Sequence, residues 1–176
     1  MNMVKRKVNV KISTNSIIER QPVPVLGIDY KVRIIYKNIK IAQLDVENSI
    51  IKISLPNSYK KTSNKQILDL AIEKMYEQIA KVEIERAMEK MRILLGFAPE
   101  DYEIKKMSKV LGKCQESKIM INPEVVMYDR KTIDYVILHQ YCHLKYKTHS
   151  KGFMKMLEKY EPQYQRYEDM ILSYIK

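Results

Sequence analysis

The chain has 176 residues, of which 45% are hydrophobic and 30% charged, and this size and composition fit one globular domain with a buried core. With only four glycines and six prolines, the sequence argues against disorder and against a loop-rich β architecture. Its basic N-terminus lacks the apolar run of a signal peptide, and no stretch approaches the roughly 18 apolar residues of a membrane span, so we expect a cytoplasmic protein without a membrane partner.

The first sixty residues predict a small antiparallel sheet. Apolar and polar residues alternate there with the period of half-buried strands. The predicted strands are residues 8–12, 30–36, 39–46 and 51–55. Breaks are predicted at residues 21–24, 37–38 and 47–49 and at Pro56.

A long helix follows the predicted sheet. From Ile67 to Leu95 the apolar residues recur every three or four positions, which is the helical period. Ser63 and Gln66 form a capping box at its start, and Gly96 stands where the residue after a helix end belongs. We expect this helix to bend or break near residues 81–82, where the apolar pattern shifts.

The C-terminal part predicts two short strands and three helices. The strands are residues 102–107 and 118–121. One helix begins near residues 129–132 and carries two histidines, and Ser150 is placed to cap a second helix that runs to Tyr160. Pro162 can open the last helix as its first residue.

The three histidines of the chain all lie within one window, at His139, His143 and His149. Residues four apart share one face of a helix, so the first two can bind one metal ion together. The third can complete the site if the helix ends between them. Three nitrogen ligands with an open fourth position are typical of a catalytic zinc site. An isolated pair of this spacing more often marks surface or core residues, but the clustering favours a metal.

The residue after the first histidine is Gln140. In the helical zinc-hydrolase motif H-E-x-x-H this position holds the glutamate that acts as general base. An amide does not accept a proton near neutral pH, and acid–base catalysis typically contributes about 10²- to 10⁴-fold. We therefore expect severely reduced turnover unless Glu116, Glu124 or Glu158 reaches the site. Cys142, about 100° around the helix from His143, is expected to be a small buried thiol, as is Cys114.

The stretch from Ser108 to Tyr164 resembles the YgjP-like metal-dependent hydrolases, relatives of the SprT-like and Wss1-like zincins. The matching text is IDYVILHQYCHL at residues 133–144 and HSKGF at residues 149–153. Family members show YVVxHELxHL and then His-Ser-x-x-Phe at this spacing. A second signature, Arg-x-Trp-Gly-Ser-Cys, is similar to residues 109–114 in a degraded form that keeps its glycine and cysteine, and Asn122 matches a family asparagine.

The resemblance implies that His139, His143 and His149 hold one zinc ion per chain, and that Gln140 occupies the position of the general base. It also supports an α+β fold. An antiparallel β-meander over residues 1–60 and a long connecting helix precede a zincin-like metal-binding helical region, with the second unit spanning residues 61–176. We expect these parts to form one compact domain.

We interpret the chain as a zinc-dependent, metallopeptidase-like hydrolase of peptides, proteins or nucleotides whose HQxxH form is inactive or impaired. Three alternatives remain open: a catalytically silent, metal-stabilised binding module, a metalloprotease associated with nucleic acid, and a nucleotide pyrophosphatase. The net charge of +11 attracts phosphate-bearing partners such as nucleic acid. A lysine-rich composition can equally reflect the base composition of a genome.

Overall fold

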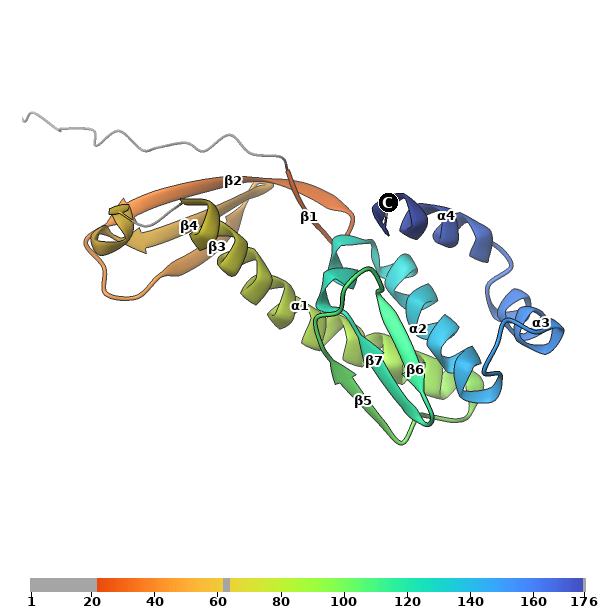
Figure 1. Cartoon of the computed structure of the whole chain (residues 1–176). Coiled ribbons are helices and arrows are strands. Elements are labelled where there is room, and N and C mark those ends of the chain that lie inside the picture. The colour runs from red at the N-terminus through yellow and green to blue at the C-terminus, as the bar shows by residue number, and fades with distance from the viewer. Residues whose placement is uncertain (1–21, 62–63, 176) are drawn as a thin grey trace, which may run out of the picture.

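The fold is α+β, as expected, with a long helix between two small sheets (Figure 1). The computed structural model describes residues 22–61 and 64–175. Its strands are β1 (Val23–Val25), β2 (Ile28–Lys37), β3 (Gln43–Glu47), β4 (Ile50–Pro56), β5 (Asp101–Ile104), β6 (Gly112–Gln115) and β7 (Lys118–Ile121). Its α-helices are α1 (Asn64–Leu95), α2 (Arg130–Lys145), α3 (Lys151–Tyr160) and α4 (Tyr164–Ile175), and the short 3₁₀ helices are η1 (Asn57–Lys61) and η2 (Pro123–Met127).

The N-terminal sheet is not the simple antiparallel meander that the sequence predicts. Its strand order is β1-β2-β4-β3, and β4 pairs with β2 in parallel and with β3 antiparallel. The reason is burial: Ile51, Ile53 and Leu55 of β4 are all buried, whereas every residue of β3 is exposed. The most apolar strand therefore takes a central position and β3 takes the edge.

Two boundaries in this region differ from the prediction. The predicted break at residues 21–24 overlaps β1, and the chain turns instead at Leu26 and Gly27, whose positive φ angles of 50° and 78° form a tight turn into β2. The predicted strand over 39–46 begins only at Gln43. The predicted strand over residues 8–12 lies outside the described residues.

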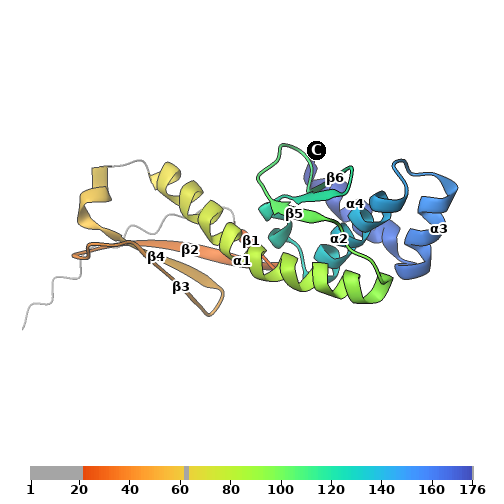
Figure 2. The same ribbon diagram turned by 90° about the horizontal axis from the view of Figure 1, so that it is seen from below.

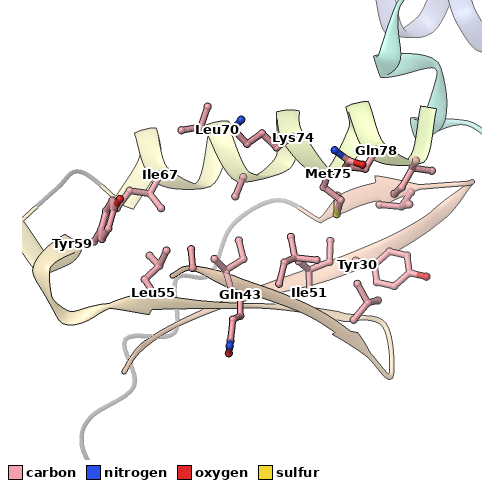
Figure 3. A pocket seen from close by; sticks show the side chains of 17 residues that line it. Tyr30, Gln43, Ile51, Leu55, Tyr59, Ile67, Leu70, Lys74, Met75 and Gln78 are labelled. Atoms are coloured by element: carbon pink, nitrogen blue, oxygen red, sulfur yellow. The ribbon is translucent and has the colours of Figure 1, made fainter. Parts of the chain in front are cut away.

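An open apolar groove separates the N-terminal sheet from the first half of α1. Figure 3 shows Ile51 and Leu55 of β4 facing Ile67 and Met75 of the helix across this space. The groove has a volume of about 750 Å³. The groove is lined by the apolar side chains whose alternation along the strands and helical spacing along α1 predicted these elements from the sequence.

Helix α1 runs unbroken from Asn64 to Leu95, so of the expected bend or break near residues 81–82 the break does not occur. Figure 2 shows the two halves of the helix running in different directions. Its buried side chains form one uninterrupted stripe along the helix: Leu68, Met75, Tyr76, Ala80, Ile84, Ala87, Met88 and Met91. Gly96 ends the helix as predicted, with a φ of 74° and an N–H that donates to the Arg92 carbonyl at 3.0 Å. Ser63 of the predicted capping box lies outside the described residues.

The second half of α1 packs against α2 (Figure 2). Arg86 of α1 joins the helices by donating to Asp134 of α2 at 2.8 Å, and it also donates to Glu83 of its own helix at 3.0 Å. Arg130 at the start of α2 donates to the buried Glu83 at 2.7 Å. These contacts fix the position of α2, on which two of the three predicted metal ligands, His139 and His143, lie.

The second sheet has the order β5-β7-β6, with β7 parallel to β5 and antiparallel to β6. The predicted strand at 118–121 is confirmed, and the strand predicted at 102–107 is observed over 101–104. Strand β6 was not predicted, because its sequence Gly-Lys-Cys-Gln has no apolar alternation. Among the described residues no helix is both long and apolar enough to cross a membrane.

Candidate metal centre

Helix α2 presents two of the histidines because both its start and its rotation are fixed. As predicted, the helix starts near residue 129. The Asp129 side chain accepts from the Thr132 N–H at 2.8 Å, which satisfies a free donor at the helix N-terminus. Ile133 and Ile137 are fully buried on one face. His139, one turn from the other candidate ligand, His143, stays half-buried at the edge of a cleft.

The loop after α2 returns the third histidine to the first two. Helix α2 ends at Lys145, and α3 begins after Ser150, whose hydroxyl accepts from the Phe153 N–H at 3.4 Å. The predicted cap is therefore confirmed. His149 precedes this cap directly, so its position is set by the start of α3. The last helix, α4, begins at Tyr164, two residues after the proline predicted to open it.

The three imidazoles converge through their Nε2 atoms. His149 Nε2 lies 3.1 Å from His139 Nε2 and 3.2 Å from His143 Nε2. One N–H on His149 can serve only one of these contacts, whereas a cation satisfies all three nitrogens. Two zinc–nitrogen bonds of about 2.0–2.1 Å at a tetrahedral angle hold their nitrogens roughly 3.3 Å apart. The residues present therefore fit a zinc ion, and the cluster can hold a metal.

Phe153 forms the apolar floor of this cluster. Its fully buried ring lies with its centroid 5.0 Å from the ring of His139, 4.7 Å from His143 and 4.5 Å from His149. Burial, followed by the neighbouring imidazoles, lowers the pKa of His139 to about 4, and burial also lowers the pKa of His143. Both rings therefore keep the neutral form that binds metals.

The outward-facing nitrogens of two rings have partners that orient them. His143 Nδ1 lies 3.1 Å from the Tyr146 carbonyl oxygen, an acceptor, so this nitrogen carries the proton and Nε2 the lone pair. His139 Nδ1 lies 3.3 Å from the hydroxyl of Tyr135, which donates to Glu168 at 3.0 Å. Burial and the neighbouring Glu168 raise the pKa of Tyr135, so the phenol stays protonated.

A cleft of about 260 Å³ borders the cluster. Its wall residues come from the segment entering β6, from α2 and from α4: Val110, Leu111, Gly112, Tyr135, Val136, His139, Gln140, Glu168, Ile171 and Leu172. Gln140 is 6% exposed and lies against β6, where a methyl group added to Gly112 would stand 2.9 Å from the Gln140 Nε2. The side chain at position 140 therefore faces the cleft wall.

The structure brings the three predicted histidines together, and Gln140 lines the cleft beside His139. Glu116, Glu124 and Glu158 do not line the cleft, whereas Glu168, which the sequence reasoning did not consider, does. The sequence points to Glu168 only indirectly. Tyr135, which donates a hydrogen bond to Glu168, stands one helical turn before His139. Cys142 is fully buried, as expected, and burial raises its pKa to about 12. Cys114 is half-buried.

The three converging histidines define a potential metal-binding site on an α+β fold. The family described as "YgjP-like, metallopeptidase domain" matches residues 2–173, and the chain belongs to this family. This membership agrees with the resemblance that the histidine motif carries.

Two solved structures are similar to the chain. The metallopeptidase zymogen abylysin of Pyrococcus abyssi is 24% identical, with a TM-score of 0.47 over 51% of this chain and 92% of that one. The metallopeptidase zymogen jannalysin of Methanocaldococcus jannaschii is also 24% identical, with a TM-score of 0.48 over 53% of this chain and 91% of that one. None of the curated proteins compared with the chain matches it.

Proposed function

We propose that the chain is a zinc-dependent, metallopeptidase-like hydrolase that binds one zinc ion through His139, His143 and His149. We further propose that hydrolysis by this form is abolished or impaired because Gln140 stands where the general base belongs. The observation that carries the proposal is the convergence of three Nε2 atoms beside a cleft, with that of His149 lying 3.1 Å from that of His139 and 3.2 Å from that of His143. Membership of a metallopeptidase family supports the hydrolase class.

Bound zinc supplies a Lewis acid that polarises the scissile carbonyl and lowers the pKa of a water molecule. The chain's own residues prepare the site for that role. Burial of His139, whose ring packs against Phe153, lowers its pKa and keeps its ligand nitrogen unprotonated. Gln140 can orient a water molecule through its amide, but it cannot take up the proton that bond cleavage requires. The missing group is therefore a proton acceptor, not a ligand.

The cleft favours a peptide or protein substrate. Val110, Leu111, Val136, Ile171 and Leu172 give it apolar walls, which suit an apolar side chain better than a triphosphate. Hydrolysis of a nucleotide is accordingly the less favoured alternative. We also propose a cytoplasmic location, which the two free cysteines support because disulfides are rare in reducing compartments.

A second candidate function is a silent binding module that keeps the metal for structure, and Gln140 is the observation that favours it. The two functions separate in one experiment. Zinc-loaded Gln140→Glu and the unaltered chain are compared on peptides, proteins and nucleoside triphosphates, with Gln78→Glu, an exposed residue on α1, as the charge-matched control.

We expect Gln140→Glu to raise hydrolysis by about 10²-fold or more, because a positioned carboxylate restores acid–base catalysis. The control should leave the rate unchanged. Equal rates for the two forms on a substrate that the zinc site cleaves would show that residue 140 is not the missing base. Absence of hydrolysis by zinc-loaded Gln140→Glu across the panel would favour the binding module.

A further inference from the structure

The C-terminal helix α4 contributes two consecutive residues to the surroundings of His139. Tyr167 is buried and stacks on the ring of Tyr135, with centroids 5.2 Å apart and planes inclined by 17°. Glu168, the next residue, accepts from the Tyr135 hydroxyl at 3.0 Å. The ring and the hydroxyl of Tyr135 are therefore both held by α4, a helix that carries no candidate metal ligand.

The hydroxyl of Tyr135 lies between a carboxylate and an imidazole in a defined order. It donates to Glu168, so its oxygen lone pairs remain available to the His139 Nδ1–H at 3.3 Å. A proton on Nδ1 leaves the lone pair of His139 on Nε2, the atom that faces the other two histidines. The negative charge of the Glu168 carboxylate, at the end of this chain of hydrogen bonds farthest from His139, makes the imidazole a more basic ligand for a metal ion.

We propose that Glu168 and Tyr135 are positioning residues for the metal centre, forming a chain from Glu168 through Tyr135 to His139 that fixes the Nδ1–H tautomer and the ring orientation of His139. This inference rests on the proposed metal site, because it assigns the ligand atom of one of its histidines. Glu168 acts only through the phenol. The alternative is a structural contact in which the same hydrogen bond merely fastens α4 to α2.

Zinc affinity of the full-length chain distinguishes these roles. Dissociation constants are measured by competition with a chromophoric chelator for Tyr135→Phe, Glu168→Gln and the double variant. Asp169→Asn removes one carboxylate from the exposed neighbour of Glu168 on the same helix and is the matched control. Thermal melting of the metal-free proteins reports any general loss of stability, and the visible spectrum of the cobalt(II) forms reports the coordination geometry.

We expect each single variant to weaken zinc binding by about 10- to 100-fold, as is typical of groups that orient metal-binding histidines. The double variant should bind no more weakly than Tyr135→Phe alone, because Glu168 acts through the phenol. The control should stay within about twofold of the unaltered chain. Tyr135→Phe keeps the aromatic ring that stacks on Tyr167, so this variant should fold even if the loss of Glu168 is not tolerated.

Unchanged zinc affinity in Tyr135→Phe would overturn the inference, as would multiplicative effects of the two substitutions. A fall in melting temperature with unchanged affinity would assign Tyr135 and Glu168 the fastening role alone. Failure of the unaltered chain to bind zinc would instead refute the metal site itself. The two failures are therefore separable.

Discussion

The zinc affinity of this site should fall less steeply in acid than that of three exposed histidines. A histidine of ordinary pKa, about 6.5, is roughly nine-tenths protonated at pH 5.5 and must lose that proton before it binds. This competition weakens affinity about tenfold for each ring. Three such rings would lose about 10³-fold between pH 7.5 and pH 5.5.

Burial changes this expectation for two of the rings. Because the pKa of His139 is lowered to about 4, only about 3% of that ring is protonated at pH 5.5. The tenfold loss of zinc affinity expected from an ordinary ring at this position therefore does not occur. The lowered pKa of His143 removes part of a second tenfold loss. The sign follows from the direction: a lowered histidine pKa keeps the neutral, metal-binding form at more acid pH. We therefore expect a loss of about 10- to 10²-fold.

The measurement is a chelator competition at pH 7.5, 6.5 and 5.5, with a chelator calibrated at each pH. Titration of the histidine rings of the metal-free protein by nuclear magnetic resonance provides the independent check. A loss of 10³-fold or more, or a His139 ring that titrates near its ordinary pKa, would refute the claim that burial keeps these ligands neutral.

Alanine at both His139 and His143 should abolish zinc binding, and elemental analysis showing full occupancy in that double variant would exclude the site. Glu83→Gln should destabilise the fold by about 1–3 kcal/mol in urea titrations, because a buried carboxylate that accepts from two guanidinium groups is lost. Hydrogen bonding to those groups lowers the pKa of Glu83. The carboxylate therefore stabilises the fold above its ordinary pKa of 4.5, and this stabilisation is lost as the pH falls through the lower pKa of the folded state. The difference in stability between the variant and the unaltered chain should therefore shrink in acid. Gly27→Ala should cost about 1–2 kcal/mol in thermal melts, because φ is +78° and the new Cβ would lie 3.0 Å from that of Asp129. Nucleic-acid binding by the basic surface should weaken steeply with salt, and no gel shift with DNA or RNA at low salt would dismiss it.

The helical part of the site could be predicted because its determinants are local. Asp129 and Ser150 each accept a hydrogen bond from an N–H three residues later, and Gly96 ends α1 through its own positive φ. The spacing of His139 and His143 equals one helical turn. Each of these features depends on residues within a few positions, so the sequence pattern contains them in full.

Long-range pairing could not be read in the same way. The position of β4 between β2 and β3 follows from the burial of Ile51, Ile53 and Leu55, and alternation alone does not rank strands by burial. Glu168 meets Tyr135 across 33 residues of chain. That contact requires α4 to dock on α2, and no local signal specifies the docking.

The contacts that hold the three histidines do not involve the neighbouring residue 140 of α2. The orientation of the ligand nitrogens depends on contacts at Tyr135, Tyr146 and Phe153, none of which involves residue 140. The side chain at 140 points instead toward Gly112, where the absence of a Cβ leaves room for a long polar residue. Glutamate has nearly the same size and shape as glutamine, so it fits the same space. Under the proposed function, exchanging the Gln140 amide for a carboxylate should therefore alter proton transfer while leaving the three histidines in position.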